Sequence, residues 1–296
     1  MTIRSALTCV CTVLLLGSLT SCLGSPPPDI LTTTTILADI ARNVAGDQLV
    51  TESLLPFGAD PHSYQPVPQD TKKINESKVL IVNGADYERS LDSLLANAKD
   101  KKEFIEASAG LRLITNSEND QEVDPHLWLD PSNVIVYVDN IREGLTHFNP
   151  EGADVYEANA RAYITKLQEL DAWINGQVAQ IPPQRRVLVT NHDSVEYFAD
   201  RYGFKVVGSV IDSFSSDASP SAQQMADLVD RIKLFEVPAI FLDTADNPTL
   251  AQQIASETGV KVVTDLHLES LTEGAPAGTY IDMMRYNVTK IVEALK

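Results

Sequence analysis

The sequence predicts an α/β protein of two lobes, each a mainly parallel sheet flanked by helices, joined by one long helix. Short β-rich runs alternate with helical patterns over residues 30–148 and again over 182–296, which is typical of βαβ units. Between these two sets, residues 149–181 carry a single uninterrupted helical pattern. We therefore expect an N-terminal lobe, a bridging helix and a C-terminal lobe with these boundaries.

The predicted N-terminal lobe begins with a strand at residues 30–34 and a helix at 36–45. A second strand at 49–55 runs directly into Asp60-Pro61-His62, and a third at 78–83 closes at a turn of Asn and Gly. In parallel sheets, ligands bind at the carboxyl ends of strands. His62 therefore falls where a binding site is expected.

The bridging helix has clear start and stop signals. Asn149 is a candidate N-cap, Pro150 takes the first helical position and Glu151 places an acid in the first turn. Pro182 and Pro183 end the pattern. Between these signals, apolar side chains recur at spacings of three and four: Tyr156, Ala160, Tyr163, Leu167, Leu170, Ile174, Val178 and Ile181. Such a helix would be about 45 Å long, enough to span both lobes.

The predicted C-terminal lobe repeats the alternation of strands and helices. Strands are expected at residues 186–190, 206–211, 239–243 and 260–263. Helices are expected at residues 194–202, from Ser219-Pro220 onward, and at 280–295.

Residues 1–21 have the pattern of a secretory signal peptide, with Arg4 before an apolar core at 6–16. That core is too short for a membrane span, which needs about 20 apolar residues. Leu19-Thr20-Ser21-Cys22 then resembles the lipobox of bacterial lipoproteins, in which the cysteine becomes the acylated first residue. The alternative is a plain signal peptide followed by a chance cysteine. The mature chain would keep only Cys22, so it could form no internal disulfide.

Composition narrows the class of partner. Residues 22–29 contain three consecutive prolines and predict a semi-rigid tether that lifts a domain off a membrane surface. The net charge of −18 argues against nucleic acid and against a polybasic membrane surface. Acidity also suits a protein that binds cations.

The histidines provide the strongest functional signal. The chain has five, and two of them repeat one tripeptide, at Asp60-Pro61-His62 and Asp124-Pro125-His126. Proline fixes the backbone, so each imidazole is presented from a stiff turn, as a metal ligand requires. His192 follows a short apolar run and is expected to open a helix. The simpler interpretation is that each is an ordinary turn residue; His147, near a predicted helix end, looks ordinary.

Longer motifs resemble the zinc/manganese solute-binding lipoproteins of bacterial ABC metal importers (solute-binding protein family 9). The matching segments are LPFGADPHSYQP, VNGADYE, DPHLWLDP, TNHDSVEYFADRYGF and TYIDMMRYNVTKIVEAL, which together cover essentially the whole mature chain. The resemblance implies a metal site in the cleft between two lobes that a stiff helix joins. It also implies modest lobe motion and local loop changes on metal release.

Carried over residue by residue, the resemblance implies metal ligands at His62, His126, His192 and Glu269. The family's fourth ligand is usually an aspartate, and this chain has LHLESLTEG in that stretch. Asp265 and His267 therefore compete with Glu269. If the stretch is extended, all three side chains lie on one face, so spacing alone does not choose between them.

The resemblance implies a monomeric, non-enzymatic receptor outside the cytoplasm that captures a divalent transition metal and hands it to an ABC-type permease in the membrane. Three imidazoles and a carboxylate favour Zn²⁺. Two features would favour Mn²⁺ instead: bidentate coordination by Glu269, and the absence of histidines from residues 113–123. The alternatives are a secreted zinc-dependent hydrolase and a surface adhesin. The sequence carries no HExxH or GxSxG motif that would favour a hydrolase.

Overall fold

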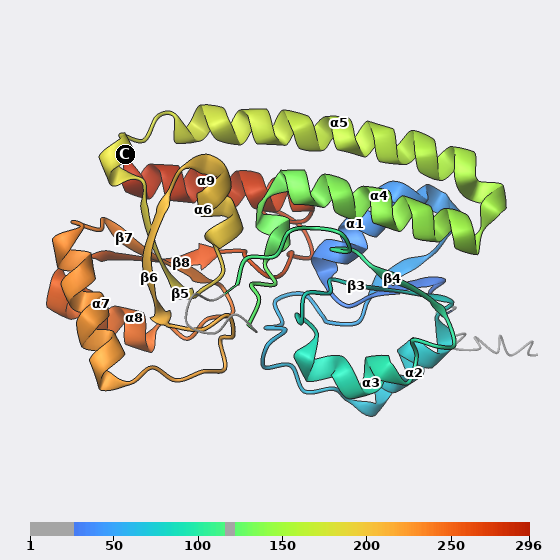
Figure 1. Ribbon diagram of the computed structural model, residues 1–296, viewed down its shortest axis with the longest axis horizontal. Coiled ribbons are helices and arrows are strands. Elements are labelled where there is room, and N and C mark those ends of the chain that lie inside the picture. The colour runs from blue at the N-terminus through green and yellow to red at the C-terminus, as the bar shows by residue number, and fades with distance from the viewer. Residues whose placement is uncertain (1–26, 116–121) are drawn as a thin grey trace, which may run out of the picture.

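The computed structural model describes residues 27–115 and 122–296 and contains two four-stranded sheets, both entirely parallel (Figure 1). The first, in the order β2-β1-β3-β4, consists of β1 Ile30–Thr32, β2 Thr51–Ser53, β3 Val79–Val82 and β4 Glu103–Glu106. The second, in the order β6-β5-β7-β8, consists of β5 Val187–His192, β6 Lys205–Ile211, β7 Ala239–Asp243 and β8 Lys261–Leu266. We call each sheet with its helices the N-lobe and the C-lobe.

Helices cover both faces of each sheet, which confirms the predicted fold class. The N-lobe carries α1 Thr35–Ala45, α2 Pro68–Glu76, α3 Asp92–Ala96 and α4 Pro131–Phe148. The C-lobe carries α6 Glu196–Tyr202, α7 Ala222–Leu234, α8 Thr249–Thr258 and α9 Tyr280–Leu295. No helix in the described part of the chain is long and apolar enough to cross a membrane.

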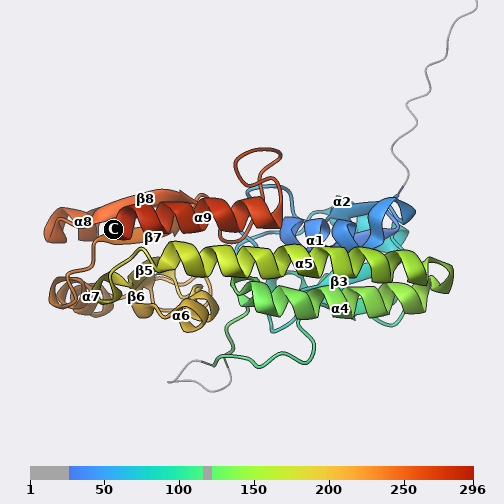
Figure 2. The same ribbon diagram turned by 90° about the horizontal axis from the view of Figure 1, so that it is seen from above.

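The long helix α5, Ala153–Val178, runs along both lobes (Figures 1 and 2). It packs against α1 and α4 of the N-lobe and against α9 of the C-lobe. Its 26 residues give a length of about 39 Å, shorter than expected. At the predicted start, Asn149 takes the N-cap position of a 3₁₀ turn, Pro150–Gly152, which leads into α5. Its side-chain amide donates to the Tyr156 hydroxyl (2.8 Å) and makes no cap hydrogen bond.

Several other element boundaries also differ from the prediction, and two of these differences have a clear cause. The strand expected at residues 49–55 keeps only Thr51–Ser53, because only these residues pair with β1. Helix α7 begins at Ala222 rather than at Ser219-Pro220, since Ser221 caps it: the Ser221 hydroxyl accepts a hydrogen bond from the Gln224 amide (3.2 Å).

One buried apolar cluster runs through both lobes. It includes side chains from β1, α1 and α4 of the N-lobe, from α5, and from α6, β7 and α9 of the C-lobe. Smaller clusters lie under α2 and α3 in the N-lobe and under α7 and α8 in the C-lobe. Wide separation of the lobes would expose the shared cluster to water, which is costly. The packing therefore favours a modest opening around the cleft.

Candidate metal centre

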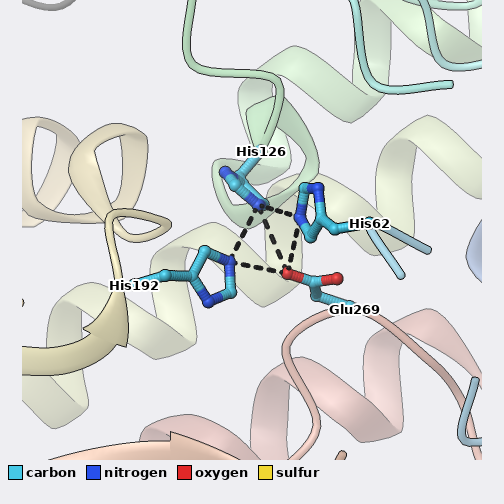
Figure 3. Close-up of side chains that lie close together, drawn as sticks. All are labelled: His62, His126, His192 and Glu269. Atoms are coloured by element: carbon cyan, nitrogen blue, oxygen red, sulfur yellow. Dashed lines mark hydrogen bonds and ion pairs between the residues drawn. The ribbon is translucent and has the colours of Figure 1, made fainter. Parts of the chain in front are cut away.

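Four side chains converge between the lobes (Figure 3). His62, His126, His192 and Glu269 each offer one ligand atom, and these atoms all lie within 4.8 Å of one another. His126 Nε2 lies 3.3 Å from His62 Nε2 and 3.4 Å from His192 Nε2. Glu269 Oε1 lies 3.2 Å, 3.3 Å and 2.8 Å from the Nε2 atoms of His62, His126 and His192. Tetrahedral bonds of about 2.0 Å to a central ion would separate neighbouring ligand atoms by about 3.3 Å.

Each lobe contributes two of these residues from the carboxyl-terminal side of its sheet. His62 lies in the loop between β2 and α2, and His126 lies immediately before the 3₁₀ turn Leu127–Leu129. His192 is the last residue of β5, so it does not open a helix as expected; α6 begins at Glu196. Glu269 follows the end of β8. Loops after parallel strands are where such folds place their ligand sites.

Asp265 and His267, the two alternatives to Glu269 as fourth ligand, lie outside the cluster of four side chains. Asp265 pairs with Lys290 (2.6 Å) and accepts a hydrogen bond from the Tyr286 hydroxyl (2.9 Å). The backbone amide of His267 donates to Asn287 (2.9 Å), and its ring packs against Tyr286. The condition of an extended stretch, under which all three side chains would share one face, is not met, because β8 ends at Leu266 and the chain then bends.

In each Asp-Pro-His tripeptide, the aspartate side chain accepts a hydrogen bond from the backbone amide of the histidine. Asp60 Oδ1 accepts a hydrogen bond from the His62 amide (2.9 Å), and Asp124 Oδ1 accepts one from the His126 amide (2.9 Å). Asp124 Oδ1 also lies 2.7 Å from His126 Nδ1, which leaves Nε2 facing the cluster. A carboxylate on the far nitrogen of a ligand histidine fixes its orientation and raises its basicity. This role of the two aspartates was not predicted, although their repetition beside the histidines signalled it.

The centre contains several ionisable side chains that are buried away from water. Burial alone would lower the pKa of His126, but its hydrogen bonds with Asp124 and Glu269 outweigh burial and raise that pKa to about 10. Burial likewise opposes ionisation of Glu269, yet the surrounding His62, His126 and His192 hold its pKa well below the usual range. The cluster thus keeps an ionised carboxylate that would balance part of the charge of a divalent cation.

Aromatic rings wall the cluster on the N-lobe side. Tyr87 meets the rings of His62 and Trp128 edge-on, with centroids 5.5 Å and 4.8 Å away, and Trp128 lies 5.4 Å from His126. Gly84 begins the turn that presents Tyr87, with a φ of 84° that favours glycine. Such walls restrict the rotamers of the histidines and exclude water.

The remaining sequence predictions concern His147 and segments that the structure does not describe in full. His147 is an exposed residue in the last turn of α4, and its Nδ1 lies 2.9 Å from Glu103. Cys22 and the leader at residues 1–21 lie outside the described residues. So does much of the 113–123 stretch, of which residues 116–121 are not described.

In the comparisons with known proteins, the matches are to zinc-uptake and metal-binding proteins. A sequence model of the family described as zinc-uptake complex component A, periplasmic, matches residues 30–294. The manganese-binding lipoprotein MntA of Halalkalibacterium halodurans is 36% identical over 267 residues, covering 90% of this chain and 88% of that protein. A Mn-bound periplasmic metal binding protein from Candidatus Liberibacter asiaticus has a TM-score of 0.82 and 30% identity over 90% of this chain and 99% of its own. The periplasmic zinc binding protein TroA from Treponema pallidum has a TM-score of 0.83 and 26% identity with the same coverage.

Proposed function

Because this chain belongs to the family of periplasmic zinc-uptake complex component A proteins, we propose that it is an extracytoplasmic receptor for a divalent transition metal. It captures the ion and delivers it to an ABC-type permease in the membrane. Relatives whose names state manganese or zinc binding support this function, but their names differ in the metal.

The observation that carries the proposal is the convergence of His62, His126, His192 and Glu269 within 4.8 Å. We assign these four as the metal ligands. The side chains are at most 7% exposed, so an ion between them would be removed from water. A catalytic zinc typically has three protein ligands and an open position for water, whereas four protein ligands fill a tetrahedral shell. The donor set therefore suits binding and release better than hydrolysis.

We favour Zn²⁺ as the cargo, with Mn²⁺ as the alternative. Three imidazole nitrogens and one carboxylate oxygen form a borderline donor set, and at such a site Zn²⁺ binds more tightly than Mn²⁺. Four of the six ligand-atom separations, at 3.2–3.4 Å, are close to the tetrahedral value of about 3.3 Å. The separation between His192 and Glu269 is shorter, at 2.8 Å, and all six lie within 4.8 Å. If the second oxygen of Glu269 also coordinates, the higher coordination number suits Mn²⁺.

The N-terminus supplies the location. We propose that residues 1–21 are removed, that Cys22 is acylated, and that residues 22–29 tether the folded part to the bacterial membrane, facing the periplasm or the cell surface. The N-terminal lobe at 30–148, the bridging segment at 149–181 and the C-terminal lobe at 182–296 then act together as a monomer. Mass spectrometry of the membrane-extracted protein should show the lipid mass on Cys22, and a soluble form that begins elsewhere would contradict the anchor.

The receptor function is tested by comparing binding with turnover. Chelator-treated protein should melt at a markedly higher temperature when Zn²⁺ or Mn²⁺ is restored. Ligand at about 1,000 times its dissociation constant adds about 4 kcal/mol to the free energy of unfolding. An unchanged melting temperature with both ions would refute metal capture. Metal-dependent hydrolysis of esters, peptides or phosphoesters would favour an enzyme instead.

A further inference from the structure

The four ligand side chains are not equally shielded from water. His62 is the most exposed, at 7% of its side chain, against 0% for His126, 2% for His192 and 5% for Glu269. A cavity of about 90 Å³ adjoins His62. It is the natural side for an ion to leave, because His62 is the most exposed of the four ligand side chains.

The C-lobe covers this side with the loop at residues 212–217, which follows β6. Phe214 and Ser215 of that loop line the cavity beside His62, together with Tyr87 of the N-lobe. Phe214 is itself buried, at 7% exposure. The loop therefore reaches across the cleft towards a ligand of the opposite lobe.

One hydrogen bond fastens this loop to the N-lobe. The Ser216 hydroxyl donates to Asp60 Oδ2 at 2.7 Å, across 156 residues of sequence. The other carboxylate oxygen of Asp60 accepts the hydrogen bond from the His62 amide. At its other end, the loop is bonded to the C-lobe ligand strand, since the Asp193 amide donates to the Ser213 carbonyl oxygen at 2.9 Å. The loop is thus hydrogen-bonded at one end to Asp193, next to His192, and at the other end to Asp60, which positions His62. Neither of these hydrogen bonds involves a metal ligand side chain.

We propose that Ser216 is a positioning residue that keeps the loop at residues 212–217 closed over the His62 side of the bound ion, acting through Asp60 on His62. This inference rests on the proposed function of metal capture. While the Ser216–Asp60 hydrogen bond is made, the loop at 212–217 stays in place beside His62; the Gly58–Ser270 hydrogen bond ties the first ligand loop to the C-lobe separately. When the Ser216–Asp60 hydrogen bond breaks, the loop at 212–217 withdraws and the His62 side opens. Ser216 therefore sets the rate of metal release rather than the folding of either lobe.

The chain offers a matched control on the same oxygen. The Ser63 hydroxyl also donates to Asp60 Oδ2, at 2.9 Å, but from within the N-lobe. Ser63→Ala removes a hydrogen bond of the same kind without unfastening the lobes. Ser216→Ala removes the one that crosses the cleft. Ser216→Thr keeps a hydroxyl at that position.

The test measures metal dissociation by stopped flow, with excess chelator and the mature chain loaded with Zn²⁺. Ser216→Ala should release the ion about tenfold faster than wild type, the effect of losing one hydrogen bond to a charged group. The association rate should stay unchanged, and the melting temperature of the metal-free protein should fall no further than it does with Ser63→Ala, which loses a hydrogen bond of the same kind. Ser63→Ala should remain within about twofold of wild type, and Ser216→Thr should restore most of the slow release. In an Asp60→Ala background, Ser216→Ala should have no further effect.

Equal release rates for Ser216→Ala and Ser63→Ala would overturn the inference. So would a Ser216→Ala variant whose metal-free form melts at a clearly lower temperature than that of Ser63→Ala, because faster release would then follow from general destabilisation. Failure of the proposed function looks different: wild type itself would then bind no Zn²⁺ and no Mn²⁺.

Discussion

The indole Nε1 of Trp128 donates a buried hydrogen bond of 2.8 Å to the carbonyl oxygen of Leu268. Trp128 follows the N-lobe ligand His126, and Leu268 precedes the C-lobe ligand Glu269. A neighbouring contact has the same effect, since the Gly58 amide donates to the Ser270 hydroxyl (2.8 Å). The segment that carries Glu269 is therefore fastened to the N-lobe on both sides of the carboxylate. The Trp128–Leu268 hydrogen bond therefore sets the distance between the ligands His126 and Glu269 whether or not an ion is bound.

Replacing Trp128 by Phe tests that relationship. The ring would still pack against Tyr87, but the Leu268 carbonyl oxygen would lose its indole donor, which costs about 1–3 kcal/mol when the group is buried. We expect a lower melting temperature of the metal-free protein and weaker metal binding, measured by calorimetry. Trp173→Phe is the control, since Trp173 lies on α5, where it stacks on Arg285. Equal effects of the two substitutions would contradict a spacing role for Trp128.

Alanine substitutions across residues 265–269 test the fourth ligand. Glu269→Ala should weaken metal binding by more than about 100-fold, beyond the 10- to 100-fold typical of residues that only support a ligand. Asp265→Ala removes a surface pair with Lys290 and should change affinity little. His267→Ala should act on stability rather than on binding. If His267→Ala weakens binding more than Glu269→Ala does, the ligand assignment is wrong.

The pKa of His126 predicts how metal binding depends on pH. With that pKa at about 10, the metal-free protein carries a proton on His126 at pH 8. A metal ion and this proton compete for Nε2, so binding should release about one proton per ion and affinity should fall as the pH drops. Calorimetry at pH 8 in buffers of different ionisation enthalpy counts the protons.

Asp124→Asn should reduce that proton release, because the amide no longer holds the imidazolium form of His126. Asp60→Asn is the matched control. Its carboxylate accepts a hydrogen bond from the backbone amide of His62, and the same substitution there should leave the proton count unchanged. Binding at pH 8 without proton release would contradict the protonated state of His126.

Metal selectivity should depend on His192. His192→Glu replaces a borderline nitrogen by a hard oxygen, so the preference should shift from Zn²⁺ towards Mn²⁺. Competition titrations with both ions measure the ratio of affinities. An unchanged Zn²⁺/Mn²⁺ ratio would mean that His192 does not coordinate the ion.

The fold could be predicted wherever local pattern and burial agree. The strand predicted at residues 78–83 corresponds to β3, all four of whose residues are buried, and the helix predicted at 280–295 matches α9. Strand β4 was missed because Glu103–Glu106 is only four residues long and places its two apolar residues between acids, a stretch too short to stand out. Helix α2 was missed because its sequence, PQDTKKINE, is mostly polar and buries only Asp70 and Ile74.

The site was harder to predict where it depends on distant contacts. The choice between Asp265 and Glu269 depends on where β8 ends and how the chain turns. Asp243, on the neighbouring strand β7, accepts hydrogen bonds from the amides of Leu268 and Glu269 and so fixes that turn. No spacing within residues 265–269 reveals this contact. The Ser216–Asp60 hydrogen bond, between residues 156 apart in sequence, was equally invisible.

The central claim is that His62, His126, His192 and Glu269 bind one divalent ion between the lobes. Calorimetric titration of chelator-treated protein, first with Zn²⁺ and then separately with Mn²⁺, tests it most directly. The account predicts a single high-affinity site with one ion per chain, abolished by Glu269→Ala. A titration that shows no binding of either ion, or tight binding that survives Glu269→Ala unchanged, would contradict it.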